Sequence, residues 1–352
     1  VSSSGLFLLT GIPGQEDIHL WISIPFCLMY GNSVILFSIK TDPSLHEPMY
    51  IFLSMLAVTD LGLSISTMPT ILGVYLFKYR EISLDACFAQ LFFIHSFQFA
   101  ESSILLLMAF DRFVAIRDPL RYSSTLTLPR TSMMGLVFIL RGVAVVFPFP
   151  FLLKRFRYCR DNVLSHSYCL HQEVMRLACS DITVNNIYGL SVTLLTVGLD
   201  SLFIFFSYVM ILKTVLSIAS PVECLRALNT CVSHLCAVLL FYTPEIGLTV
   251  IHRFGKNSPP LLQVLLGYIS LLIPPLMNPI VVSSSPGSGD TRNEKHGAMH
   301  SDICCILDPL PLRTLPLFHL FSLYPTPCYS SLPEASPPLQ AAIQGQAMMR
   351  AA

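Results

Sequence analysis

Long stretches of mostly apolar residues recur along this chain, and shorter segments with charged residues, proline and glycine separate them. An α-helix needs about 20 predominantly apolar residues to cross the hydrocarbon of a bilayer, and seven of the stretches reach that length. Their hydropathy is nearly continuous, whereas the strands of a membrane β-barrel alternate between apolar and polar residues. We therefore predict an all-α protein that folds as a seven-transmembrane helix bundle. The predicted spans are residues 18–39, 49–77, 87–116, 131–153, 186–212, 226–251 and 261–282.

The composition favours a membrane protein over a soluble one. Apolar residues make up 53% of the chain and charged residues 12%, so a single soluble core would leave too much apolar surface in water. Membrane lipid is therefore the expected partner of the spans. The formal net charge is +0, and this balance gives no indication of nucleic-acid binding.

The spans divide the chain into three regions. Residues 18–282 form the predicted membrane domain. Residues 1–17 precede it, and because the chain begins at Val1 without a signal peptide, we expect this N-terminal segment to be truncated. Residues 283–352 hold nine prolines and many Ser, Leu and Ala without a helical or strand period, which predicts a disordered tail.

Cysteine positions orient the bundle better than lysine and arginine do. With the N-terminus outside, Lys and Arg number eleven on inner and nine on outer segments, so the positive-inside rule scarcely discriminates. Cys87 begins the third span and shares a membrane side with Cys159, Cys169 and Cys179 of the loop after the fourth span. Four cysteines on one side indicate an oxidising compartment. Four cysteines allow three pairings, and a set of free thiols is the alternative.

Acidic residues inside apolar spans are costly, and they normally face the bundle interior beside a partner. Asp60 in the second span, Glu101 in the third and Asn278 in the seventh are expected to converge on one buried polar site. Two neighbouring carboxylates repel unless they share a proton or a cation. A sodium ion at Asp60 and Glu101 is one interpretation, and a protonated carboxyl that donates to its neighbour is the other.

Other charges lie near the ends and middles of the spans. Asp111 and Arg112 are adjacent at the inner end of the third span, where the arginine can reach water and the pair can hold the inner face closed. Arg141 in the fourth span and Asp200 in the fifth have no partner that the sequence identifies.

A polar set is expected at the outer end of the bundle. His95 lies eight residues after Cys87, about 12 Å along a helix that rises about 1.5 Å per residue. Arg253 ends the sixth span on the same side. Its guanidinium is suited to a carboxylate, and His95 and Gln172 can add donors. The alternative for a span-terminal arginine is an interaction with lipid headgroups.

Catalysis is not predicted. The sequence has no Gly-rich phosphate loop, no zinc-ligand pair on one helical turn and no serine elbow, so neither an enzyme nor a cofactor other than the sodium ion is expected. A transporter is a remote alternative. The two halves of many transporters show an internal repeat and a matched pair of broken helices, and this sequence shows neither pattern clearly.

Two long strings of residues resemble the odorant receptors, a family of G-protein-coupled receptors. LHEPMYIFLSMLAVTD and MAFDRFVAIRDPLRY are specific to that family, and they occupy residues 45–60 and 108–122. Further matches are GNSVIL at 31–36, SY at 207–208, ALNTCVSHLCAVLLFYTP at 227–244 and PPLMNPI at 274–280. The resemblance covers about residues 5–281.

Two other strings are similar to the class I, or fish-like, branch of this family. They are SYCLHQEV at residues 167–174 and VIHRFG at 250–255. Many class I receptors respond to carboxylic acids. In such relatives the positions that match Arg253, His95 and Gln172 hold the ligand carboxylate, and those that match Asp60 and Glu101 lie at a buried cation site.

The resemblance also implies disulfides, location and signalling. It implies a Cys87–Cys169 bridge and a second bridge, Cys159–Cys179, within the outer loop. It implies a plasma-membrane protein with an extracellular N-terminus. A small odorant would bind on the outer side, and the inner end of the third span, with Arg112, would face a G protein of the stimulatory, olfactory type that raises cyclic AMP.

The chain departs from the family pattern at two places. The family continues from Asn-Pro at the end of the seventh span to a tyrosine and a short basic helix, whereas here Val282 and SSSPGSGD follow. The alternative function is therefore a poorly trafficked or non-functional isoform or pseudogene product. Glu245 places an acid near the outer site, where relatives carry an apolar residue, and it is expected either to pair with Arg253 or to point elsewhere.

Overall fold

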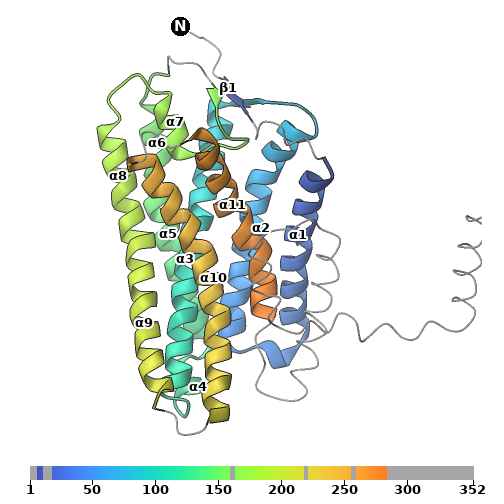
Figure 1. Ribbon diagram of the computed structural model, residues 1–352, viewed down its shortest axis with the longest axis vertical. Coiled ribbons are helices and arrows are strands. Elements are labelled where there is room, and N and C mark those ends of the chain that lie inside the picture. The colour runs from blue at the N-terminus through green and yellow to red at the C-terminus, as the bar shows by residue number, and fades with distance from the viewer. Residues whose placement is uncertain (1–5, 11–17, 159–162, 218–220, 255–258, 284–352) are drawn as a thin grey trace, which may run out of the picture.

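The computed structural model describes residues 6–10, 18–158, 163–217, 221–254 and 259–283, which form a bundle of long helices (Figure 1). Short helices cap the connections: η1 (Pro43–Leu45), α4 (Tyr122–Thr125) and α7 (His171–Arg176). The seven helical columns are α1 (Ile18–Thr41), α2 (Pro48–Tyr75), α3 (Leu84–Arg117), α5 with α6 (Leu128–Val146 and Pro148–Lys154), α8 with η2 and α9 (Thr183–Thr193, Leu194–Gly198 and Leu199–Val215), α10 (Pro221–Phe254) and α11 (Pro260–Ser283).

The columns coincide with the predicted spans and extend a few residues beyond most of their ends. Five described segments are both long and apolar enough to cross a membrane: Pro48–Tyr75, Leu128–Lys154, Thr183–Val215, Cys231–Arg253 and Leu261–Pro279. The helices α1 and α3 are also long enough, with 24 and 34 residues, although their described parts are not in that set. The predicted tail, from residue 284 onward, lies outside the described residues.

Two columns contain a local break with an identifiable cause. The fourth column is divided into α5 and α6 at Phe147 and Pro148, because proline lacks the N–H that would continue the ladder of hydrogen bonds. The fifth column contains a π-helical turn at Leu194–Gly198. Such turns often occur at functional sites, and Asp200 lies two residues after the end of this one.

Burial separates the central columns from the peripheral ones. In the most apolar window of the α2 column 56% of the residues are buried, against 22% for the α5–α6 column and 28% for the α8–α9 column. Large apolar side chains such as Leu140, Phe203 and Phe205 are more than half exposed. A soluble protein would not present so much contiguous apolar surface to water, so these faces are suited to lipid.

A small sheet at the outer end was not predicted from the sequence. Strand β1 (Leu6–Leu9) pairs antiparallel with β2 (Glu81–Ser83) and parallel with β3 (Val163–Leu164). Phe7 is 1% exposed and meets the ring of Tyr158 edge-on at 5.5 Å between centroids. The strand is only four residues long, and its pairing partners are remote in sequence, so local pattern could not reveal it.

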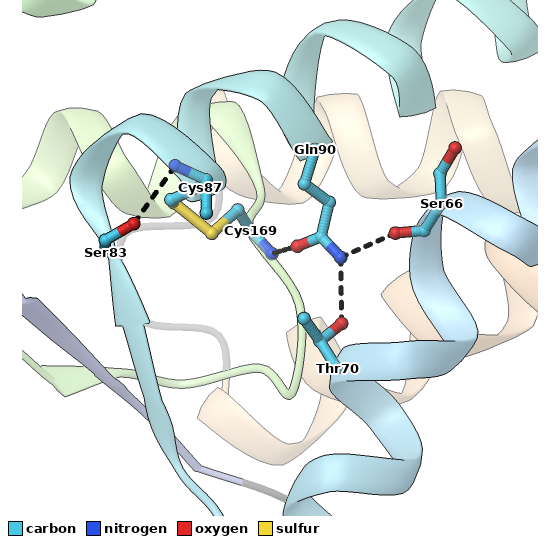
Figure 2. The surroundings of a disulfide bond; sticks show 7 residues. Ser66, Thr70, Ser83, Cys87, Gln90 and Cys169 are labelled. Atoms are coloured by element: carbon cyan, nitrogen blue, oxygen red, sulfur yellow. Dashed lines mark hydrogen bonds between the residues drawn. A yellow bond between two sulfur atoms is a disulfide. The ribbon is translucent and has the colours of Figure 1, made fainter.

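The structure contains a disulfide between Cys87 and Cys169 (Figure 2). It ties the start of α3 to the outer loop, and Gln90 strengthens this attachment. The backbone N–H of Cys169 donates to Gln90 Oε1 at 2.9 Å, while Gln90 Nε2 donates to the carbonyl of Ser66 and to Thr70 Oγ1, both at 2.8 Å. One side chain of α3 thus holds both the loop and α2.

The same outer loop packs tightly against α11. A Cβ atom added at Gly267 would lie 2.7 Å from the Tyr168 hydroxyl and 2.9 Å from His166 Nε2. Tyr168 is 2% exposed and His166 is fully buried, so neither side chain has free space to move into. Glycine at this position therefore allows the loop to lie directly on α11.

We predict that Gly267→Ala destabilises the protein by roughly 1 to 3 kcal/mol, because the added methyl group overpacks this contact. Thermal unfolding of the purified protein measures the loss. Gly247→Ala is the matched control: its added Cβ would lie 3.9 Å from the nearest side chain, so the better helix propensity of alanine should leave stability equal or higher. Equal stability of the two variants would show that the loop is not held this closely.

Candidate functional site

Three polar residues from three helices meet in the bundle interior, as predicted. Asp60 of α2, Glu101 of α3 and Asn278 of α11 are each at most 2% exposed. The amide Nδ2 of Asn278 donates to Asp60 Oδ2 at 3.1 Å and to Glu101 Oε1 at 3.1 Å. One neutral amide therefore joins two carboxyl groups that would repel each other if both were ionised.

The arrangement is suited to a shared proton or a small cation. Carboxylate and amide oxygens are the ligands that hard cations prefer, and the two acids supply carboxyl oxygens here. Among the described residues, no group of three or more His, Cys, Asp or Glu side chains is arranged to hold a metal ion. A cation at Asp60 and Glu101 would thus need further oxygen ligands besides these two acids.

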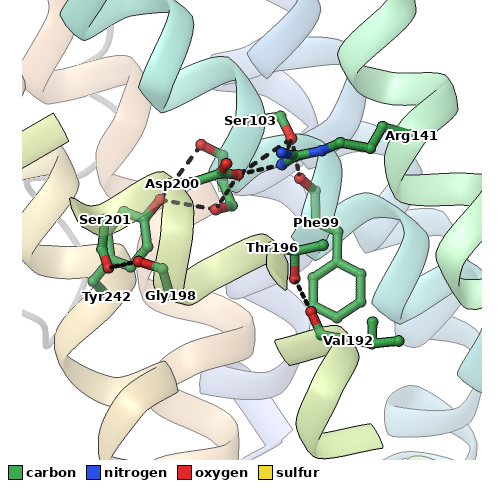
Figure 3. A network of polar contacts seen from close by, with 10 residues as sticks. Phe99, Ser103, Arg141, Val192, Thr196, Gly198, Asp200, Ser201 and Tyr242 are labelled. Carbon is green, nitrogen blue, oxygen red and sulfur yellow. Dashed lines mark hydrogen bonds and ion pairs between the residues drawn. The ribbon is translucent and has the colours of Figure 1, made fainter. Parts of the chain in front are cut away.

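No partner was predicted for Arg141 or Asp200, but the structure pairs them with each other (Figure 3). Arg141 Nη2 lies 2.5 Å from Asp200 Oδ2 and donates to Ser103 Oγ at 2.9 Å. Ser102 Oγ donates to the same Asp200 oxygen at 3.1 Å, and it lies 2.8 Å from the hydroxyl of Tyr242. The network joins α3, α5, α9 and α10.

The two charges of this pair are not equally enclosed. The side chain of Arg141 is 32% exposed, whereas that of Asp200 is 1% exposed. The guanidinium also lies 5.1 Å from the centroid of the Phe138 ring, which favours a cation there. The arginine is therefore partly exposed at the periphery of the bundle, whereas the aspartate is enclosed in its interior.

At the inner end of α3, Asp111 is fully buried and joins two neighbours. Arg112 Nη2 lies 3.2 Å from Asp111 Oδ2, and the Tyr122 hydroxyl of α4 donates to Asp111 Oδ1 at 2.8 Å. Nearby, the Tyr208 hydroxyl of α9 lies 2.6 Å from His234 Nδ1 of α10. The inner parts of α9 and α10 are thus joined by a hydrogen bond, close to the inner end of α3, which Arg112 and Tyr122 hold through Asp111.

At the outer end, Arg253 contacts α8. Its Nη1 donates to Asn186 Oδ1 at 2.6 Å and to the Asn186 carbonyl at 3.3 Å. Its Nε is buried without a hydrogen-bond partner among the described residues. A Cβ added at Gly189 would lie 3.8 Å from Arg253 Nη2 and 3.3 Å from the His171 ring, so glycine lets both side chains lie close to α8.

His171 links this arginine to α3, and the sequence analysis did not single it out. The rings of His171 and His95 lie 6.2 Å apart, and the Phe149 ring lies 4.6 Å from His171 and 5.9 Å from His95. His171 Nε2 also lies 3.2 Å from Asn185 Oδ1. A signal was present, because His171 precedes Gln172 within the SYCLHQEV string.

The three residues predicted to hold a carboxylate lie at the outer end, but they do not form a single hydrogen-bonded set. Neither His95 nor Gln172 bonds to Arg253 in the described structure. The Oε1 of Gln172 is buried without a hydrogen-bond partner among the described residues. His171 lies between His95 and Arg253, so it belongs to the candidate site with Arg253.

Burial keeps the histidines of the outer loop neutral. Desolvation lowers the pKa of His171 to about 3, with a further contribution from His95 and Arg253. Desolvation likewise lowers the pKa of His166 to about 4, although Glu173 opposes the shift. At neutral pH the positive charge beside His171 is therefore that of Arg253.

Glu245 contacts α3 and α11 and forms no ion pair with Arg253 in the described part of the chain. Gln98 Nε2 of α3 donates to Glu245 Oε2 at 3.4 Å, and Ser270 of α11 also hydrogen-bonds to this carboxyl. Within the described part of the chain, no Lys or Arg forms an ion pair with it. The acid faces α3 and α11, whereas the arginine faces α8.

The second predicted bridge is described at one end only. Cys179 is disulfide-bonded, and Cys159 lies outside the described residues. Cys27, Cys231 and Cys236 are free thiols.

Comparison with known proteins places the chain in one group. The sequence model of a family described as "Olfactory receptor" matches residues 22–286. "Olfactory receptor 51G2" of Homo sapiens is 65% identical over 287 residues, which are 80% of this chain and 91% of that relative. "Olfactory receptor 51A7" of Homo sapiens is 60% identical, over 78% of this chain and 90% of the relative.

We predict that Arg141→Leu and Asp200→Leu each destabilise the protein. Each leaves one unpaired charge at a cost of up to roughly 3 to 5 kcal/mol, because Asp200 is enclosed in the bundle and Arg141 lies in the middle of a membrane span, where a lone charge is unfavourable. Thermal unfolding in detergent or nanodiscs measures both changes.

The double variant Arg141→Leu/Asp200→Leu tests the cause. It removes both charges, so it should recover much of the stability that Arg141→Leu loses. Additive losses in the double variant would mean that the two residues act independently.

Proposed function

Because the chain belongs to the olfactory receptor family of odorant G-protein-coupled receptors, we propose that it detects carboxylic acid odorants and signals through a stimulatory, olfactory-type G protein to cyclic AMP. Membership of the family makes it a multi-pass, seven-helix membrane protein that binds an odorant and couples to a G protein. Receptors of this family are not enzymes. The ligand class and the type of G protein are the parts of the proposal that need a test.

The observation that carries the acid proposal is the state of Arg253. Its Nη1 is held by Asn186, but its Nε is buried without a hydrogen-bond partner among the described residues. An unmet buried donor costs about 1 to 3 kcal/mol. A ligand carboxylate that accepts from Arg253 would remove this cost.

His95, His171 and Gln172 then complete the proposed site. The two imidazole rings and Phe149 form a partly apolar wall, and the Gln172 amide adds polar atoms at the loop end. A single cation among neutral polar groups favours an anionic ligand group over an ester or an alcohol. The N-terminus would be extracellular in the plasma membrane, so this end of the bundle would meet odorants outside the cell.

A route for the signal runs along α10. Arg253 lies at the outer end of this helix, Tyr242 joins the Arg141–Asp200 network midway, and His234 pairs with Tyr208 near the inner end. A ligand that changes the position of the outer end can therefore shift contacts along one continuous helix. The G protein would then bind where Asp111 and Arg112 close the inner face.

A sodium ion shared by Asp60 and Glu101 is part of the proposal as a structural element. It would neutralise the two carboxylates that Asn278 brings together, and it takes no part in ligand binding.

Replacing Asp111 or Arg112 should change signalling without abolishing ligand binding, because both lie at the opposite end of α3 from the outer site. Loss of a charge-assisted contact of about 1.5 to 3 kcal/mol should alter G-protein activation about tenfold or more. Ligand affinity should change far less. A binding assay beside a G-protein assay separates the two effects, and equal losses in both would instead indicate misfolding.

Arg253→Ala should lower the potency of a responsive acid by about tenfold or more, since a hydrogen bond to a charged group contributes about 1.5 to 3 kcal/mol. Asn186→Ala is the informative companion: it removes the internal competitor for Nη1, so acid potency should rise. A cyclic AMP reporter normalised to surface level provides the dose–response curves.

The methyl ester and the alcohol of the same acid serve as ligand controls and should be insensitive to Arg253→Ala. If Arg253→Ala kept wild-type potency for the acid, Arg253 would not be its binding residue.

A further inference from the structure

We propose that Glu245 and Gln98 form a second polar subsite that binds a hydrogen-bond donor on the ligand. The receptor would then prefer medium-chain acids that carry a hydroxyl or amino group far from the carboxylate. This inference rests on the proposed acid site at Arg253, and it specifies the other end of the ligand.

Glu245 and Gln98 can accept more hydrogen bonds than the protein supplies to them. A carboxylate has about four acceptor positions, yet Glu245 receives a contact of 3.4 Å from Gln98, which is long for a hydrogen bond, and one from Ser270. Gln98 is 6% exposed, and its Oε1 has no hydrogen-bond partner among the described residues. Two neighbouring groups therefore offer acceptors without matching donors.

Glu245 has no protein cation as a partner among the described residues. Ion pairs there join Asp111 with Arg112 and Asp200 with Arg141, but none includes Glu245. The charged group with which Glu245 interacts is instead another acid, Glu101. A buried carboxylate without a cationic partner is unfavourable, so a ligand that supplies a donor or a cation gains from binding there.

Glu245 lies between the outer loop and the buried acids. It contacts Gln98, which is one helical turn from Glu101 toward the outer end of α3. It also contacts Ser270 of α11, two residues from Tyr268, whose ring lies 5.8 Å from that of Tyr168 in the outer loop. A ligand held beneath the outer loop is thus within reach of this acid.

The two ends are joined by a run of polar and aromatic side chains. Arg253 and His171 flank Gly189, the His171 ring lies 6.2 Å from that of His95, and Gln98 follows His95 by one helical turn on α3. Arg253 and Glu245 are eight residues apart on α10, about 12 Å along a helix. A medium-chain acid can span this separation, with its carboxylate at Arg253 and a donor at Glu245.

The test compares ligands that differ only at the far end. Plain acids, ω-hydroxy acids and ω-amino acids of matched chain length are added to receptor purified in nanodiscs. Binding is measured as ligand-induced thermal stabilisation, which does not depend on a G protein. For the wild-type receptor, the hydroxy acid should bind from about twofold to about tenfold more tightly than the plain acid, as expected for one added hydrogen bond.

Two substitutions separate hydrogen bonding from charge. Glu245→Leu should abolish the preference for both donor ligands and leave the plain acid bound at least as well. Glu245→Gln should keep the preference for the hydroxy acid and lose the larger preference for the amino acid. Glu81→Gln is the matched control on the exposed strand β2, and it should behave as the wild type.

Each outcome bears on one hypothesis. Equal binding of plain and hydroxy acids by the wild-type receptor would overturn the second subsite, and so would a donor preference that persists in Glu245→Leu. Plain acids that still bind in an Arg253-dependent manner would in that case leave the proposed acid function intact. If no acid of the series bound the folded receptor, the acid function itself would be wrong, and the second subsite with it.

Discussion

Polar side chains inside this bundle must find their partners within the bundle, because the hydrocarbon of a bilayer offers neither donors nor acceptors. The helix α3 supplies many of these polar partners. Its Glu101 bonds to Asn278 of α11, Ser102 and Ser103 meet the Arg141–Asp200 pair, and Gln90 holds α2 and the outer loop. Each pairing fixes the rotation of a second helix against α3, so α3 must lie at the centre of the bundle.

The consequence is a molecule whose two ends are connected through shared helices. The disulfide and Gln90 fix the outer end of α3, and Asp111 with Tyr122 fixes its inner end. The helix α10 contacts the same networks through Tyr242, and at its outer end Arg253 bonds to Asn186 of α8. In the proposed receptor, α3 would be the fixed helix and α10 the helix that responds to the ligand.

The charged residues inside the bundle differ in how far they are buried and in whether they have an ion-pair partner. Asp200 is enclosed and depends on Arg141, while Arg141 keeps access to the surrounding membrane. Glu245 has no such partner in the described structure, and this difference is why we propose that it is available to a ligand. A buried charge that the protein does not satisfy is a position where binding energy can be gained.

The sequence by itself determined the membrane class, the positions of all seven columns and the convergence of Asp60, Glu101 and Asn278. Hydropathy depends on composition along one segment, so it can be read without knowing any neighbour. The family strings added the expected Cys87–Cys169 bridge. The tertiary structure alone decided that Arg141 pairs with Asp200, that His171 stands beside Arg253, that Glu245 turns toward Gln98 and that residues 6–9 form a strand. Those contacts depend on how helices far apart in sequence are rotated against one another, and the pattern within a single helix does not specify that rotation.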